Sequence, residues 1–148
     1  MRYQLELDIV VERERIIALF LDSNNLEKWQ TSLVSFELIS GTENREVGSQ
    51  SRQVHKMGGR ELEIIETITV HDYPDEFSAT YESADVWNLI ENRFIDAGAG
   101  KTKWILVSDF RSTNLFMKFL SFFFPGMFKK QTLTFMNKFK DFVEGTRA

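Results

Sequence analysis

The stretch KMGGRELEIIETITV, residues 56 to 70, decides the fold because it sets both a tight turn and the inner face of a sheet. Gly58 and Gly59 predict a two-residue hairpin turn, since both central residues of such turns favour positive φ. The turn fixes how the two flanking strands pair, and Ser51 then faces Glu66. Glu66 shares its parity with apolar neighbours, so we expect this carboxylate on the buried face of the sheet.

The segments on either side of this hairpin alternate like strands and are joined by short turns, which indicates an antiparallel meander. The strands are expected over residues 3–10, 33–40, 47–57, 60–72, 76–83, 86–96 and 101–111. Between the first two strands the apolar spacing becomes helical and the residues DSNN interrupt it, which predicts two short helices.

The end of the chain is predicted to be helical. Phe135 and Phe139 belong to a stripe of apolar residues at helical spacing, and Pro125 suits the first turn of a helix but not its interior. We therefore expect a short helix near 113–123 and a long one near 125–145. Whether the two join into one kinked helix is left open. Only the long helix can cover the apolar face of the sheet.

The composition is typical of a soluble globular protein. The 148 residues are 43% hydrophobic and 27% charged, and they fit a single domain over residues 1–148. The absence of cysteine excludes disulfides, thiolate nucleophiles and cysteine-ligated metals. The N-terminus lacks a signal-peptide core, and no stretch reaches the about 18 apolar residues of a membrane span. We expect a cytoplasmic protein without stable membrane insertion.

The charge is distributed unevenly along the chain. The net charge is −4, yet the residues from Arg111 onward hold seven Lys/Arg and two Asp/Glu, against eleven and twenty in the first 110 residues. The basic end suits either an anionic partner or a solvated helix face. No phosphate loop, nucleophile elbow or metal-ligand spacing is present, and the acidic net charge argues against nucleic acid. We expect no cofactor, no metal and no nucleic-acid partner.

Four stretches carry a resemblance to a known family. They are RERIIALFLDSNNLEKWQ at 13–30, GGRELEIIETITVHDYPDEF at 58–77, GAGKTKWILVSDF at 98–110 and LTFMNKFKDFVEG at 133–145. Together they resemble the START-like, helix-grip (SRPBCC) superfamily, in particular its small bacterial polyketide cyclase/dehydrase-like members. The resemblance implies an α+β fold in which a curved, seven-stranded antiparallel sheet wraps around a long C-terminal helix and leaves a cavity between them.

The inner face of the sheet supplies the candidate site. When the hairpin register is extended across the later turns, mostly apolar side chains and a few polar ones face inward. Such a mixture is typical of small-molecule sites. The predicted cavity lining consists of Trp29, Gln53, His55, Ile64, Glu66, Ile68, Tyr81, Asn88, Asn92, Phe94, Trp104, Leu106, Phe119, Phe123, Phe128, Phe135, Met136 and Phe139.

Glu66 is the most informative residue, because an unpaired carboxylate on an apolar face is costly. It is either a ligand anchor or general base, with His55 and Tyr81 as polar helpers, or a structural residue. In the structural case it is satisfied by Ser51, Tyr81 or water, or is turned outward by a β-bulge. His55 lies near the hairpin end and His71 has the opposite parity, so we expect both histidines to be solvated.

Three functions follow from these observations. The leading hypothesis is that the protein binds a hydrophobic or amphipathic small molecule without catalysing a reaction. The resemblance implies a lipid-like or polyketide-like ligand, because members of the superfamily bind such molecules. The alternative is a cyclase- or aromatase-type enzyme that uses Glu66 as acid or base. The third is a protein-interaction module that works through the terminal helix or the convex face of the sheet. The outward-facing apolar residues are either a candidate homodimer surface, if they lie together, or isolated surface side chains; they are Ile65, Trp87, Leu89, Ile105 and Val107.

The aromatic stretch FLSFFFPGMFKK, residues 119 to 130, raises a separate question about membranes. At helical spacing the same residues are needed to cover the sheet, so membrane contact is the lesser alternative. Phe119, Phe122 and Phe123 are expected to close the mouth of the cavity. Phe124, beside the proline, is left as an exposed gate.

Overall fold

The Gly58-Gly59 turn joins two strands in the predicted register. Both glycines have positive φ, at 58° and 80°, and Ser51 pairs with Glu66 across the hairpin. The computed structural model describes residues 1–146 and extends this hairpin into a seven-stranded antiparallel sheet of order β1-β7-β6-β5-β4-β3-β2. The strands are β1 Arg2–Ile9, β2 Leu33–Ser40, β3 Gln50–Met57, β4 Arg60–Asp72, β5 Glu76–Glu82, β6 Val86–Asp96 and β7 Thr102–Ser112.

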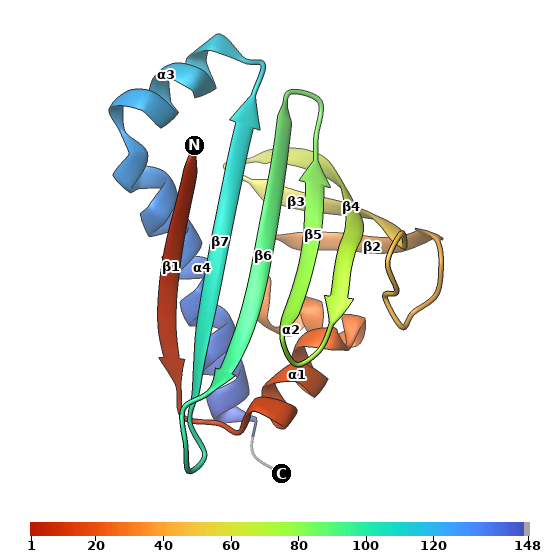
Figure 1. Ribbon diagram of the computed structural model, residues 1–148. Coiled ribbons are helices and arrows are strands. Elements are labelled where there is room, and N and C mark those ends of the chain that lie inside the picture. The colour runs from red at the N-terminus through yellow and green to blue at the C-terminus, as the bar shows by residue number, and fades with distance from the viewer. Residues whose placement is uncertain (147–148) are drawn as a thin grey trace.

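The helices cover one side of this sheet (Figure 1). They are α1 Arg13–Leu21, the 3-10 turn η1 Ser23–Asn25, α2 Leu26–Trp29, α3 Leu115–Phe123 and α4 Pro125–Gly145. The long α4 packs mainly against β1 and α2, and the upper part of the β3–β4 hairpin bends round behind β6 on the same side of the sheet. This arrangement is the predicted helix-grip architecture.

The terminal segment forms two helices, which settles the point that the sequence left open. The Asn114 side chain accepts hydrogen bonds from the amides of Phe116 and Met117 and so caps α3. Phe124 separates the two helices, and Pro125 begins α4 in the position where a missing amide costs nothing. No helix within residues 1–146 is long and apolar enough to span a membrane.

One irregularity changes the inner face near the lower end of β4. A register shift lies between Ile68 and Val70, after which His71 pairs with Phe77. The shift reverses the parity of the strand, so His71 turns toward the inside, where its ring contacts those of Tyr73 and Phe77. The expected parity of His71 was therefore wrong, and its side chain is partly buried.

The inner face divides into two halves. In the sealed half, inward side chains are 0–2% exposed and pack beneath α1, α2 and α4. This half contains Ile68, Phe77, Phe94, Trp104 and Leu106. In the open half, nearer the upper ends of the strands, six inward side chains are only partly covered or exposed, although Gln53, His55 and Ser108 beside them are buried. This half contains Leu62, Ile64, Val86, Asn88, Ile90 and Phe110.

Phe20 of α1 lies at the centre of the sealed half. Its ring lies 5.3 Å from that of Phe94 and 5.4 Å from that of Phe139, both edge-on, and three further aromatic rings surround it. Edge-to-face contacts of this kind stabilise a core beyond the burial of area alone. The helical spacing of Ile16 and Phe20 already placed both residues on one face of α1, and both are buried.

Candidate functional site

Glu66 lies on the inner face, as predicted, at the boundary between the two halves. It is 4% exposed, and its partner is Arg45 from the loop between β2 and β3. The Nη2 nitrogen of Arg45 donates to both carboxylate oxygens of Glu66 at 2.9 Å, and the Ser51 hydroxyl adds a longer contact at 3.4 Å. The carboxylate is thus both paired and hydrogen-bonded, which is what allows a charge to be buried here.

Several groups hold Arg45 in place. Its backbone has a φ of 56°, which is unusual for a residue other than glycine, and the ring nitrogen Nδ1 of His71 hydrogen-bonds its carbonyl oxygen at 2.7 Å. The guanidinium lies 4.9 Å from the centre of the Phe77 ring, close enough for a cation–π contact. Burial acts to lower the pKa of Arg45, but the charge of Glu66 and the neighbouring tyrosines raise it overall.

A row of polar side chains on β3 continues from this ion pair toward the open half. Ser51, Gln53 and His55 alternate along the strand, and all three are buried. Because the Ser51 hydroxyl donates to Glu66, its oxygen is the acceptor for the Gln53 amide at 3.2 Å. The Gln53 carbonyl then accepts from Nε2 of His55 at 3.1 Å, and the Ser32 hydroxyl donates to Nδ1 at 2.9 Å. Every donor in this row points toward the carboxylate.

The titrating groups of the row are held in their uncharged forms. Burial lowers the pKa of His55, against the opposing effect of the Glu66 charge. Burial and the Glu66 charge raise the pKa of Tyr81, which pairs with Glu66 across β4 and β5. At neutral pH the site therefore presents a neutral imidazole and a protonated phenol. The expectation that His55 is solvated was wrong, because Leu33 of β2 pairs with it and Ser32, just before β2, bonds to its ring.

The remaining polar candidates have partners of their own. The Asn92 side chain accepts a hydrogen bond from the indole of Trp104 at 3.0 Å and is 3% exposed. The Asn88 side chain accepts from the Ser108 hydroxyl at 2.9 Å, and Asn88 remains partly exposed in the open half. Asn88 is thus available at a surface where Asn92 is not.

The apolar candidates divide between the two halves. Eight of the predicted residues lie in packed surroundings and are at most 8% exposed. They are Trp29, Ile68, Phe94, Trp104, Leu106, Phe128, Met136 and Phe139. Phe135 is partly buried against Trp29, with ring centres 4.8 Å apart. Ile64 lies in the open half, whereas Phe119 and Phe123 of α3 are 50% and 60% exposed.

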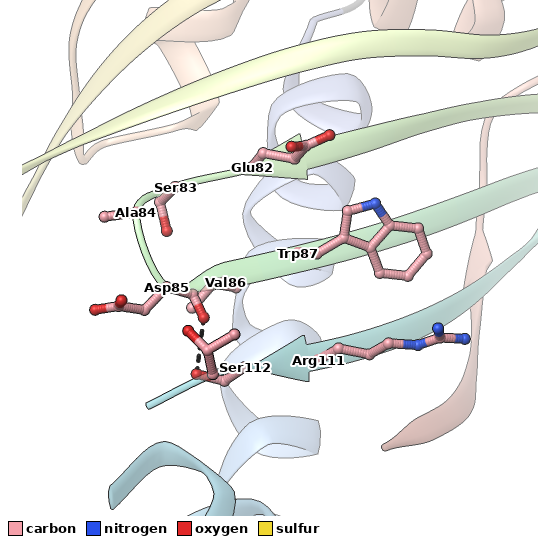
Figure 2. A pocket seen from close by; sticks show the side chains of 9 residues that line it. Glu82, Ser83, Ala84, Asp85, Val86, Trp87, Arg111 and Ser112 are labelled. Atoms are coloured by element: carbon pink, nitrogen blue, oxygen red, sulfur yellow. Dashed lines mark hydrogen bonds between the residues drawn. The ribbon is translucent and has the colours of Figure 1, made fainter. Parts of the chain in front are cut away.

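Two surface pockets lie away from the predicted site. The first, of about 270 Å³, lies at the β5–β6 turn and the end of β7, where Arg111 is 5.0 Å from the Trp87 ring centre (Figure 2). In this pocket the Ser112 hydroxyl donates to the Asp85 carbonyl at 2.9 Å. The second, of about 240 Å³, lies between the start of α1 and the β6–β7 turn. Neither shares a residue with the predicted lining.

The convex face of the sheet alternates apolar and charged side chains. Trp87 neighbours Glu82 on one strand and Arg111 on the next, and Val107 is opposite Glu91 and Gln4. The charges divide the apolar surface into separate areas. The homodimer through this face stays a prediction.

Arg45 is the functional candidate that the sequence did not reveal. It lies in the loop GTENREVG, which has the composition of a turn and no apolar pattern. One signal was present: a carboxylate expected on an apolar face needs a cationic partner, and Arg45 lies shortly before the strand whose Ser51 pairs with Glu66.

Comparisons with known proteins support the architecture. The chain matches no protein-family model and no curated protein. Similar solved structures include a protein from Thermus thermophilus, with 17% identity, a TM-score of 0.79 and coverage of 100% of both chains. A START superfamily protein from Mycobacterium smegmatis has 10% identity, a TM-score of 0.77 and coverage of 97% of both chains. An aromatase/cyclase from Streptomyces sp. R1128 has 9% identity, a TM-score of 0.77 and coverage of 97% of this chain and 93% of its own.

These similarities extend over nearly the full length of each chain, and they agree with the strand order and the long terminal helix. The chain has the START-like, helix-grip fold.

Proposed function

We propose that the protein binds a hydrophobic or amphipathic small molecule, lipid-like or polyketide-like, against the open half of the inner face, between the sheet and α4. One observation carries the proposal: the apolar inner face continues past the sealed half but loses its cover. Along β4, Ile68 is 2% exposed and Leu62 is 38% exposed, although both face inward. On α4 the inward-facing Met136 and Phe128 both stay covered, at 0% and 8% exposed, so the loss of cover is on the β4 side.

The polar groups beside this surface favour a ligand with an uncharged polar part. The imidazole of His55 is held neutral, the phenol of Tyr81 is held protonated, and Asn88 offers a carboxamide. Hydroxyl, carbonyl or amide groups on a ligand can exchange hydrogen bonds with Tyr81 and Asn88, whereas both ring nitrogens of His55 are already bonded to Ser32 and Gln53. A free charge would have no partner there, because Arg45 and Glu66 already neutralise each other.

The ion pair favours binding over catalysis by Glu66. A general base must have an oxygen free to take a proton from the substrate. Both oxygens of Glu66 already accept hydrogen bonds from Arg45, and the pair is at most 7% exposed at its side chains. A reaction of the cyclase type at Glu66 would first require Arg45 to leave.

Native mass spectrometry of protein purified from its host, without denaturation, tests the proposal directly. We expect a bound mass that organic extraction removes. A thermal-shift screen of fatty acids, sterols and aromatic polyketides should then find compounds that raise the unfolding temperature, since a ligand that binds only the folded state stabilises it.

Two neighbouring substitutions separate binding in the open half from adhesion elsewhere. Ile64 faces inward in the open half, and Ile65 is the next residue of β4 on the convex face. Ile64→Trp fills the open half and should abolish the thermal shift, whereas Ile65→Trp adds the same bulk outside and should leave it unchanged. Equal shifts in the two variants would contradict the proposed site. Co-purification of a protein in place of a small molecule would favour an interaction module.

A further inference from the structure

Five of the seven apolar side chains of α3 are exposed to water, and only Met117 and Leu120 are partly buried. Leu115, Phe116 and Phe122 are 80%, 66% and 78% exposed, and no residue of α3 is buried. The helix extends beyond the upper ends of β1 and β7 (Figure 1). We use the name docking lobe for residues 115–130, which comprise α3 and the first turns of α4. The rings of Phe119, Phe122, Phe123 and Phe124 contact one another, and an exposed apolar cluster of this kind marks an interaction site.

The charge of this region is of one sign. Between Arg111 and Lys140 the chain has six Lys/Arg and no Asp or Glu, although its net charge is −4. Lys118, Lys129 and Lys130 of the docking lobe are exposed, and within residues 1–146 none of the three forms an ion pair. The docking lobe therefore suits a partner that offers both an apolar region and negative charge.

We propose that the docking lobe binds the surface of an anionic lipid bilayer. The phenylalanines of α3 enter the boundary between headgroups and acyl chains, while Lys118, Lys129 and Lys130 contact the headgroup phosphates. The acidic remainder of the chain is repelled by the same surface, so the field orients this end toward the membrane. The contact needs no spanning helix, and it does not depend on whether a ligand occupies the open half.

The pattern of α3 favours a lipid surface over a protein. Every residue of α3 except Lys118 and Ser121 is apolar, and these two lie together on one side, so apolar side chains cover the rest of the helix. A helix that docks in a protein groove needs one apolar face, whereas lipid can surround every exposed side of a projecting helix. A symmetric contact with a second copy would bring the same three lysines face to face without an acidic partner.

Co-sedimentation with vesicles tests the proposal. We expect the wild-type chain to sediment with vesicles of phosphatidylcholine and phosphatidylglycerol, and much less with phosphatidylcholine alone. Raising the salt concentration should weaken the binding, because salt screens the lysines. Lys129→Glu with Lys130→Glu should lower the affinity more than about tenfold. Phe122→Ser with Phe123→Ser should lower it by a similar factor, about tenfold or more.

Matched variants show whether the effect belongs to the lobe. Lys56→Glu with Lys101→Glu makes the same change of net charge at exposed positions elsewhere, and Val47→Ser removes an apolar side chain that is 61% exposed. Both should bind vesicles within about twofold of the wild type. Circular dichroism checks that each variant is folded. Failure to bind anionic vesicles, or equal binding to neutral ones, overturns the proposal. The proposal also fails if light scattering shows a dimer that Phe122→Ser with Phe123→Ser dissociates while vesicle binding persists.

Discussion

The two ends of the molecule place the same kind of side chain in opposite surroundings. Phe139 of α4 is fully buried between Trp29, Trp104 and Phe20, whereas Phe122 of α3 is 78% exposed. They belong to consecutive helices, α3 and α4, separated by Phe124. The difference arises because α4 lies along the inner face and α3 extends past the end of the sheet. Burial here depends on the reach of the sheet and not on residue type.

The largest expected effect is on the buried side of this comparison. Phe139→Ala removes a fully buried ring and should lower the free energy of unfolding by about 3–5 kcal/mol, since a cavity remains where the ring was. Phe122→Ala removes an exposed ring and should change it by no more than about 0.5 kcal/mol. Urea unfolding followed by circular dichroism measures both.

Phe139→Leu provides a milder variant in case the alanine variant does not fold, and it should lose less than Phe139→Ala. If Phe122→Ala proved as destabilising as the Phe139 variants, α3 would have to pack against the sheet in solution. That result would break the comparison between the two ends.

The second prediction concerns the boundary between the sealed and open halves. Glu66→Gln leaves Arg45 charged and buried without its partner, and it should lower the free energy of unfolding by about 3 kcal/mol. Glu63→Gln on the same strand is the control, because its ion pair with Arg52 is exposed at 60% and 42% of the two side chains. The control should change stability by at most about 1 kcal/mol.

A double variant distinguishes loss of the pair from loss of the carboxylate itself. Arg45→Met with Glu66→Leu removes both charges and should recover most of the stability that Glu66→Gln loses. If the double variant is as unstable as the single one, the uncompensated charge of Arg45 is not the cause. The boundary would then depend on the neighbouring hydroxyl and amide groups instead.

Local rules predicted most of the fold. The Gly58-Gly59 pair set the register of one hairpin, and counting residues across the later short turns gave the inward parity of β5, β6 and β7 correctly. Pro125 marked the start of the long helix to the residue. These features are visible in the sequence because each depends on a few adjacent residues.

The candidate site was less predictable, because its decisive contacts join distant residues. Arg45 and Glu66 are brought together by a loop whose backbone takes a positive φ at a position that is not glycine. The inward turn of His71 depends on a register shift that the alternation of β4 does not reveal. Phe119 and Phe123 were expected at a cavity mouth, but the sheet ends before it reaches them.

The smallest effect concerns His55, at the open side of the boundary. Burial lowers the pKa of His55 in the folded chain, whereas an unfolded histidine titrates near its ordinary value of about 6.5. As the pH falls from about 7.5 to about 5.5, the unfolded state takes up a proton first, so the free energy of unfolding should fall. The decrease is at most about 1.4 kcal/mol per pH unit, and it stops once the folded imidazole is also protonated. His55→Gln should flatten this part of the urea-derived pH profile. A variant profile as steep as that of the wild type would mean that His55 is as solvated in the folded chain as in the unfolded one, and that the open half begins nearer to Glu66.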